Sequence, residues 1–139
     1  GFTRFASNIA KSKIENFNKR EKELNLMRNM VDEAVSILHN TNLSIDEFGK
    51  LLDLSWQFKR SLSDQVSTPE IDEIYNTAMN AGAIGGKILG AGGGGFILFF
   101  AKPEVQPTIR ESLKKLVHVP FNFDNSGSRV VLYQPNGLQ

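Results

Sequence analysis

Glycine is concentrated in one short stretch of this chain, and that stretch constrains the fold more than any other feature. Eight of the twelve glycines lie between Gly82 and Gly95, within the sequence AGAIGGKILGAGGGGF at residues 81–96. Because glycine loses much backbone entropy on ordering, such density needs a physical reason. Either several positions adopt positive φ, or another group approaches the backbone closely. A run of N–H groups can also form a concave nest for an anion such as phosphate, and Lys87 would add a positive charge.

Three common glycine-rich motifs fit this stretch poorly. A Walker A loop requires G-x-x-x-x-G-K-[ST], but Ala81 and Ile88 occupy its first glycine and its hydroxyl position. Residues 90–95 match G-x-G-x-x-G, yet a Rossmann motif follows a strand and opens a helix, which is the reverse of the order predicted here. A flexible linker is disfavoured because Ile84 and Leu89 would need burial. Two interpretations remain open, namely a loop that binds an anion or substrate and a tight loop with a structural role.

Composition narrows the class of protein. A length of 139 residues suits one domain, and 40% hydrophobic residues allow a modest core. The net charge of +1 gives no indication of a nucleic-acid or membrane partner. The residues include no cysteine, no targeting signal and no apolar run of membrane-spanning length, so the cytoplasm is the expected location. The chain begins Gly-Phe-Thr-Arg without methionine, which suggests a fragment.

Apolar spacing predicts three helices before the glycine-rich stretch. The first runs from about residue 14 to residue 39. The second opens with a capping box at Ser44–Glu47 and runs to about Leu62. The third begins at Pro69, where Ser67–Glu70 has capping-box spacing, and Gly82 ends it.

Three polar or aromatic residues on these helices attract attention as possible site residues. Trp56 and Lys59 lie three residues apart and are therefore neighbours on the second helix. Core or interface packing is the favoured interpretation for Trp56, and a solvated position is favoured for Lys59. His39 lies near a helix C-terminus, where a cation suits the dipole, and a structural role is favoured for it.

Strands and one further helix are predicted after the glycines. Residues 96–101 form a continuous apolar strand, and a helix covers about residues 106–117. Alternating apolar residues predict a strand at 119–123, and a turn leads to a final strand at 129–133. This order predicts an α+β fold, a two-layer sandwich in which helices pack on an antiparallel sheet.

Several stretches of the chain resemble one enzyme superfamily. The sequence GKILGAGGGGF at residues 86–96 resembles the third signature motif of the GHMP kinases, which include galactokinase, homoserine kinase, mevalonate kinase and phosphomevalonate kinase. Other segments resemble the sugar-kinase branch, most closely the D-glycero-D-manno-heptose 7-phosphate kinases and next the L-fucokinase type. Those segments are GFTRFAS (1–7), WQFK (56–59), PEIDEIY (69–75), VPFNFD (119–124) and GSR (127–129). The resemblance covers nearly the whole chain.

The resemblance implies a domain organisation. In these kinases the third motif lies in the C-terminal domain, between a helix and a strand, and the sheet includes a strand from just before the position of Gly1. ATP binds mainly to a P-x-x-x-G-L-G-S-S type of motif in an N-terminal domain, which also carries the acidic catalytic residue and the carboxylate for Mg²⁺. This chain contains no such motif. Residues 1–139 are therefore expected to be a GHMP kinase C-terminal domain that has no catalytic residue of its own and is inactive without the N-terminal domain.

The resemblance also implies site residues. The loop is expected to close the cleft from the C-terminal side and to approach the substrate and the transferable phosphate. The residues expected to do so are Gly90, Ala91, Gly92, Gly93, Gly94 and Gly95. Lys87 would be the charged contact of the loop or a structural anchor. Arg4 and Arg129 are candidates for a sugar-phosphate group because guanidinium suits bidentate phosphate recognition, although each is more often a surface arginine.

The expected reaction is the ATP-dependent phosphorylation of a sugar or sugar phosphate similar to heptose 7-phosphate. ATP and Mg²⁺ are the implied cofactors, and no metal ligand is expected within this chain. The implied partners are the small-molecule substrate and the N-terminal domain of the same protein. Three alternatives stay open: a free-standing module that binds a phosphorylated metabolite, the C-terminal part of a fucokinase- or galactokinase-like enzyme, and a structural or oligomerisation domain.

Overall fold

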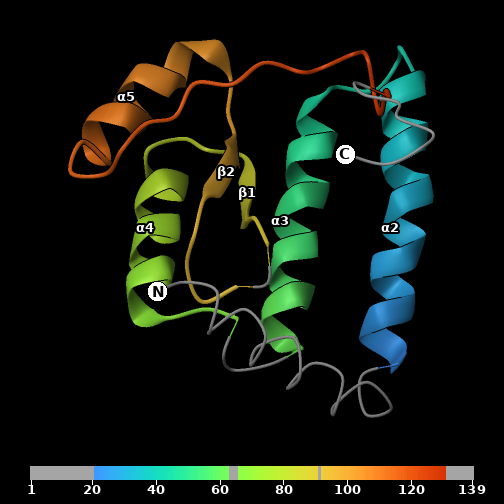
Figure 1. Ribbon diagram of the computed structural model, residues 1–139, viewed down its shortest axis with the longest axis horizontal. Coiled ribbons are helices and arrows are strands. Elements are labelled where there is room, and N and C mark those ends of the chain that lie inside the picture. Colours follow the sequence, from blue (N-terminus) through green and yellow to red (C-terminus); the bar gives the residue numbers. More distant parts are fainter. Residues whose placement is uncertain (1–20, 63–65, 91, 131–139) are drawn as a thin grey trace, which may run out of the picture.

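The computed structural model describes residues 21–62, 66–90 and 92–130, in which helices pack against an antiparallel β-hairpin. The elements follow in the order α2 (Glu21–His39), α3 (Asp46–Ser61), α4 (Pro69–Asn80), β1 (Gly85–Ile88), β2 (Ile97–Phe100), the 3-10 turn η2 (Pro103–Val105) and α5 (Gln106–Ser112). Figure 1 shows the hairpin between α4 and α3, with α2 on the far side of α3. The α+β class predicted from the sequence is confirmed.

The first two helices form a pair held by apolar side chains. Met30 and Ile37 from α2 are buried against Leu51 from α3, with the partly buried Phe48 packed beside them. The predicted first helix is confirmed from residue 21 onward, and its predicted beginning at residues 14–20 lies outside the described residues. The second helix ends at Ser61, one residue before its predicted end.

The two predicted capping boxes do not form. The hydroxyl of Ser44 accepts from the N–H of Asp46 at 3.2 Å, two residues along the chain rather than three. At the start of α4 the cap is Thr68, whose side chain accepts from the N–H of Ile71. Ser67 instead donates its hydroxyl to Asp72 at 2.5 Å. Thr68 takes the capping position because it has the extended backbone that an N-cap residue adopts.

The predicted end of the third helix at Gly82 is confirmed. Gly82 has a φ of 105°, a conformation that glycine adopts without strain from a Cβ atom. Its N–H donates to the carbonyl of Met79, and the N–H of Ala83 donates to the carbonyl of Ala78. This pair of bonds is a Schellman motif, which satisfies carbonyls left over at the end of α4 and turns the chain into β1.

The β-hairpin contains one strand that the sequence did not indicate. β1 pairs with β2 in antiparallel register from Gly85 opposite Phe100 to Ile88 opposite Ile97. The sequence predicted a loop for the whole glycine-rich stretch. That prediction is wrong for Gly85–Ile88, which form β1. Pairing with β2 makes these residues a strand, and glycine is required at position 85 because a Cβ atom there would lie 1.9 Å from the carbonyl oxygen of Gly49 in α3. Glycine here lets a helix approach a strand backbone closely.

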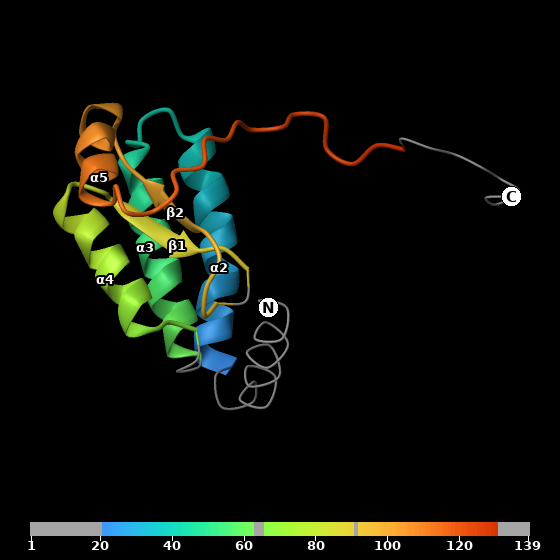
Figure 2. The same ribbon diagram turned by 60° about the vertical axis from the view of Figure 1, so that its left-hand side comes forward.

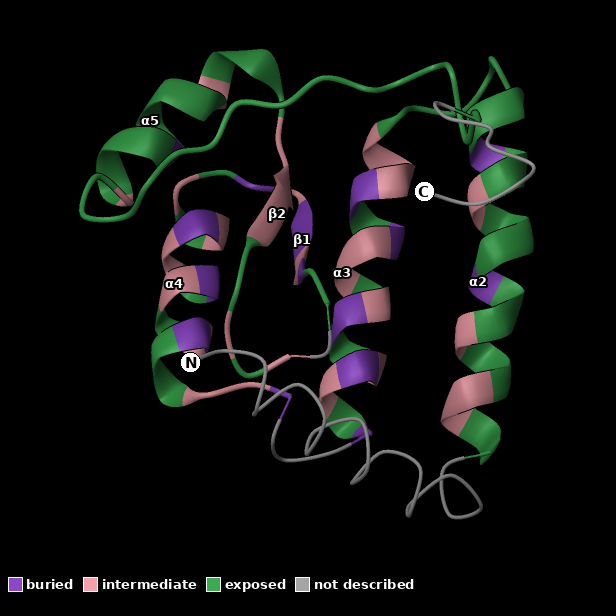
Figure 3. Ribbon diagram, in the orientation of Figure 1, coloured by how far each residue is buried: buried purple, intermediate pink, exposed green. Residues whose placement is uncertain are grey.

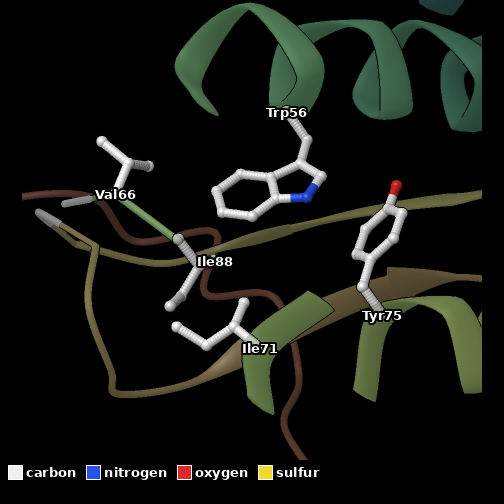
Figure 4. Packing of buried hydrophobic residues seen from close by; sticks show 5 residues of the cluster. All are labelled: Trp56, Val66, Ile71, Tyr75 and Ile88. Atoms are coloured by element: carbon white, nitrogen blue, oxygen red, sulfur yellow. The ribbon is translucent and has the colours of Figure 1, made fainter. Parts of the chain in front are cut away.

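The core lies where α3, α4 and β1 face one another, as the buried residues in Figure 3 show. Trp56, Val66, Ile71, Tyr75 and Ile88 form one cluster, and Figure 4 shows these side chains gathered between the helices and the hairpin. Trp56 is 0% exposed, which confirms the packing role favoured from the sequence. Its indole Nε1 has no hydrogen-bond partner among the described residues.

The C-terminal part departs most from the sequence prediction. Helix α5 ends at Ser112 rather than near residue 117. The predicted strand at 119–123 is wrong, because these residues are exposed and irregular, and Figure 2 shows the segment leaving the helices. For the strand predicted at 129–133, residues 129 and 130 are not in a strand and the others lie outside the described residues. Apolar alternation produces a strand only where a neighbouring strand pairs with its backbone.

Within the described residues, no helix is both long and apolar enough to cross a membrane.

Candidate functional site

The glycine loop that follows β1 has backbone angles that few residues other than glycine adopt. Gly90 has a φ of 81°, and Gly92 to Gly95 have φ values of 113°, 73°, 154° and 108°. Side chains of L-residues disfavour this region because Cβ approaches the following carbonyl. The first of the two physical reasons for glycine density, positive φ at several positions, is therefore confirmed for this loop.

The loop is tied to the segment that connects α3 to α4. The N–H of Gly93 donates to the carbonyl of Val66 at 3.0 Å. A Cβ atom on Gly92 would lie 2.7 Å from the same carbonyl oxygen. By contrast, a Cβ atom on Gly90 or Gly94 would meet nothing within 4 Å. One side of the loop therefore rests on Val66, while other positions have open space beside them.

The hairpin register determines which β1 carbonyls point away from β2. The N–H of Leu89 donates to the carbonyl of Phe96 at 2.8 Å, so residues 89 and 96 form a hydrogen-bonded pair. Such pairs alternate along an antiparallel ladder. The carbonyls of Gly86 and Ile88 consequently point outward, where buried oxygens need another donor.

Lys59 supplies the donor for the outward carbonyl of Ile88. Its Nζ donates to the Ile88 oxygen at 3.2 Å and to the Gly90 oxygen at 2.6 Å. The side chain is only 9% exposed. The solvated position favoured from the sequence is therefore wrong. The available signal was the spacing of three residues that puts Lys59 on the same helical face as the buried Trp56.

The hydroxyl of Tyr75 lies at the other outward carbonyl, and its one proton is shared between that carbonyl and the nearer carboxylate of Asp53. Its hydroxyl lies 3.3 Å from the Gly86 oxygen and 2.5 Å from Oδ1 of Asp53, which also accepts from Gln57 at 3.2 Å. Burial raises the pKa of Tyr75 well above its usual value, and the carboxylate of Asp53 raises it further. Tyr75 thus stays a protonated donor at neutral pH. The sequence placed Tyr75 on a packing face but did not indicate this polar link.

An ion pair fixes the ends of α3 and α4 on either side of Val66. Arg60 lies 3.0 Å from Oδ2 of Asp72, and both side chains are 34% exposed. Ser67 donates to the other carboxylate oxygen of Asp72. Partly exposed pairs contribute at most about 1 kcal/mol, so the pair mainly orients the connection on which the loop rests.

The residues singled out from the sequence fall into three groups. Lys87 lies in β1 opposite Leu98, half-buried, next to the strand end from which the loop starts. Arg129 is exposed in the irregular C-terminal segment. Arg4 and Ala91 lie outside the described residues. Of the residues singled out for the loop, Lys87 and the described loop glycines lie along one structural unit. The sequence analysis noted Lys59 but favoured the wrong environment for it, and it missed the contacts of Tyr75 and of the Val66 carbonyl.

Two features near the hairpin bear on ligand chemistry. Across residues 21–62, 66–90 and 92–130, no group of three or more His, Asp or Glu side chains is placed to hold a metal ion. A hollow of about 270 Å³ lies at the opposite end of β1 from the glycine loop. Its lining residues are Asp46, Lys50, Gly82, Ile84, Lys102 and Val105. Because the loop's open backbone is at the other end, the hollow and the loop are separate features.

Comparisons with known proteins agree on one family. The family model for the GHMP kinases C terminal matches residues 36–118, which include the glycine loop. The chain is 35% identical over 98 residues to D-glycero-alpha-D-manno-heptose 7-phosphate kinase of Campylobacter jejuni, covering 68% of this chain and 28% of that protein. It is 33% identical over 90 residues to mevalonate kinase of Thermococcus gammatolerans, covering 63% and 26% respectively.

A solved structure supports the same fold. The crystal structure of L. major mevalonate kinase in complex with R-mevalonate matches with a TM-score of 0.65 and 20% sequence identity, over 79% of this chain and 34% of that one. The chain thus spans 28% of the heptose kinase and 26% of the Thermococcus enzyme. Since the family model covers more than half of the residues, the chain belongs to the GHMP kinase family, matched over its C-terminal domain.

Proposed function

We propose that this chain is the C-terminal domain of an ATP-dependent small-molecule kinase whose acceptor is a sugar or sugar phosphate similar to heptose 7-phosphate. The observation that carries the proposal is the run of glycines with positive φ at Gly90 and Gly92–Gly95, held in place by Val66 and Lys59. A backbone without side chains allows a phosphate to approach its N–H groups closely. The similarity to the C. jejuni heptose kinase favours a sugar phosphate as acceptor.

In this proposal the loop closes the active-site cleft from the C-terminal side. Phosphoryl transfer depends mainly on positioning and on stabilising negative oxygens, so fixed N–H groups near the transferable phosphate would contribute directly. Gly90, Ala91 and Gly92–Gly95 are the proposed contacts, with Lys87 as charged contact or anchor. Arg4 and Arg129 are proposed as secondary contacts for a sugar-phosphate group. Arg4 lies outside the described residues, and Arg129 is exposed in the C-terminal segment.

ATP and Mg²⁺ are proposed to bind mainly to an N-terminal domain of the same protein. Mg²⁺ would neutralise charge on the phosphates during transfer. The loop's contribution from this chain is orientation of phosphate oxygens, and its open positions at Gly90 and Gly94 leave room for such a group. A cytoplasmic location stays a prediction.

The first test is the size and activity of the intact gene product. An antibody raised to this chain would be used on lysate of the source cells, and the protein it detects would be purified. We expect a product larger than 15.5 kDa that converts heptose 7-phosphate and ATP to a heptose bisphosphate and ADP, detected by mass spectrometry. The 139-residue chain alone is expected to show no turnover. A product of this chain's own mass would contradict the proposal.

A second candidate acceptor follows from the similarity to mevalonate kinase. The same assay would therefore contain parallel reactions with mevalonate, fucose and galactose. Phosphorylation of mevalonate in preference to every sugar would replace the sugar-kinase assignment while leaving the kinase assignment intact. Binding of a sugar phosphate without turnover by a product of 15.5 kDa would instead favour a free-standing binding module.

A further inference from the structure

The outward edge of β1 is paired by side chains where a neighbouring strand would otherwise supply donors. Tyr75 from α4 bonds the carbonyl of Gly86, and Lys59 from α3 bonds that of Ile88. The two donors differ in reach. Tyr75 acts within the strand, whereas Lys59 continues past the strand end and also bonds the carbonyl of Gly90 at 2.6 Å. Lys59 therefore joins the last residue of β1 to the first glycine of the loop.

We propose that Lys59 is the positioning residue of the glycine loop, because its buried ammonium fixes the peptide plane at which the loop leaves β1. The inference rests on the proposed function only for its effect on turnover. The geometric part stands on the two carbonyl bonds and on a side chain that is 9% exposed.

Both partners of this contact need it. A buried ammonium is strongly destabilising unless hydrogen bonds replace its lost hydration, and the carbonyls of Ile88 and Gly90 provide two of them. Ile88 is 1% exposed, so its outward carbonyl has little access to water if Lys59 is removed. A charged donor also makes a stronger bond than a neutral one. Loss of the ammonium therefore releases the loop at its start.

The loop has a second attachment besides Lys59. Gly93 is held by the carbonyl of Val66, so the loop is attached to the helices at its first glycine and again at Gly93. Glycines with no side-chain contacts cannot hold a conformation by packing, since Cβ positions at Gly90 and Gly94 meet nothing within 4 Å. Removing either attachment is expected to turn a fixed arrangement of N–H groups into a mobile one.

The direct test measures amide hydrogen exchange by NMR in the 139-residue chain with Lys59→Met. The N–H groups of Leu89 and Gly93 flank the proposed contact and are each hydrogen-bonded, to Phe96 and Val66 respectively. We expect their exchange to accelerate about 10- to 100-fold, the range for losing a charge-assisted hydrogen bond. The N–H of Ala83, bonded to Ala78 at the other end of β1, is expected to change less than about two-fold.

The matched control is Lys50→Met on the same helix. Lys50 is 64% exposed and pairs with Glu47, so its loss removes the same charge without touching the loop. All three reporter amides should exchange as in the parent chain. Should Lys59→Met fail to fold, Lys59→Gln, which keeps a neutral donor, gives the same three-amide comparison. Unchanged exchange at Leu89 and Gly93, or equal acceleration at Ala83, would overturn the positioning role.

The effect on turnover is measured on the intact gene product. With Lys59→Met, we expect kcat to fall about 10- to 100-fold while KM for ATP changes less than about three-fold, because misplaced groups lower the rate of transfer more than binding. Lys59→Arg should recover part of kcat, since it restores a charged donor. An unchanged kcat would overturn the link between loop position and turnover. If the unmodified product has no kinase activity, the proposed function fails, and the exchange experiment still decides the role of Lys59.

Discussion

Gly85 and Gly90 lie five residues apart in one glycine-rich stretch, yet glycine is required at each for a different reason. At Gly85 the backbone is part of a regular strand, and the constraint is space, because a Cβ atom would lie 1.9 Å from the carbonyl oxygen of Gly49. At Gly90 an added Cβ atom would meet nothing within 4 Å, and the constraint is a φ of 81°. The first glycine serves helix-to-strand packing, and the second serves a loop conformation.

This difference separates stability from function within a single motif. The strand half of the stretch joins α3 to the hairpin, so changes there should act on folding. The loop half makes few packing contacts, so changes there should act mainly on ligand binding and turnover. Substitutions that add the same methyl group at different positions therefore test the distinction.

Gly85→Ala is expected to have the largest effect. The new methyl group would overlap backbone atoms of Gly49 and come within 3.0 Å of the Asp53 N–H nitrogen, so α3 and β1 would have to separate. We expect a loss of at least about 3 kcal/mol in the free energy of unfolding, the upper end for overpacked sites. Urea denaturation of the 139-residue chain measures it. A loss no greater than that of Gly90→Ala would contradict the steric explanation.

Gly92→Ala should have the second largest effect. It should lower the free energy of unfolding and also loosen the attachment of the loop. Its Cβ would lie 2.7 Å from the carbonyl oxygen of Val66, and its φ of 113° is unfavourable for alanine. A loss of about 2 kcal/mol is expected from the two effects together. Gly93 N–H exchange, followed by NMR, should accelerate because the bond to Val66 is displaced. If stability falls while Gly93 keeps its protection, the loop is not attached through this contact.

Tyr75→Phe tests the strand half without adding any atom. The ring remains to pack on Phe99, where the centroids are 5.8 Å apart, but the one hydroxyl proton shared by the carboxylate of Asp53 and the carbonyl of Gly86 is lost. We expect a loss of about 1–2 kcal/mol in stability, because a buried acceptor is left without a partner. Thermal or urea unfolding measures the loss, and Leu89 exchange should stay unchanged. An increase in stability would show that the hydroxyl is not needed at this edge.

Gly90→Ala is expected to have the smallest effect on stability. Only the unfavourable φ opposes the substitution, since its Cβ would enter open space, and the loss should be about 1 kcal/mol. In the intact gene product we expect kcat to fall more than ten-fold, about the effect of a misplaced contact. Steady-state kinetics with ATP and the acceptor measure it. Full activity in Gly90→Ala would place the substrate contact elsewhere in the loop.

Much of the helical part of the fold was predictable because it depends on local signals. Helical periodicity located α2, α3 and α4, and Gly82 marked the end of α4 through a motif completed within six residues. The prediction of the capping residues was less accurate. Ser67 and Thr68 are adjacent hydroxyl residues, and Thr68 caps the helix because it directly precedes Pro69, where α4 begins.

The hairpin and the loop attachments depend on contacts between distant residues, and the sequence does not display those. The strand at Gly85–Ile88 depends on pairing with β2, and its glycine at position 85 on the close approach of α3, neither of which composition reveals. The position of Lys59 depends on carbonyls that follow it by 29 and 31 residues. Apolar alternation at residues 119–123 was a local signal that lacked a paired strand. Positive φ was one of two explanations that the glycine density left open; it holds for the loop, whose ligand stays a proposal.

The facing glycines at positions 49 and 85 have a consequence for laboratory evolution of this domain. In most cores, a substitution that is too large can be rescued by a smaller residue opposite it. Here the atoms opposite Gly85 are main-chain atoms of Gly49 and Asp53, which every amino acid possesses. A genetic screen for second-site suppressors of Gly85→Ala should therefore recover true revertants and no compensating change at position 49. We therefore expect glycine at positions 49 and 85 to stay unchanged during such evolution, while positions that contact only side chains can change together.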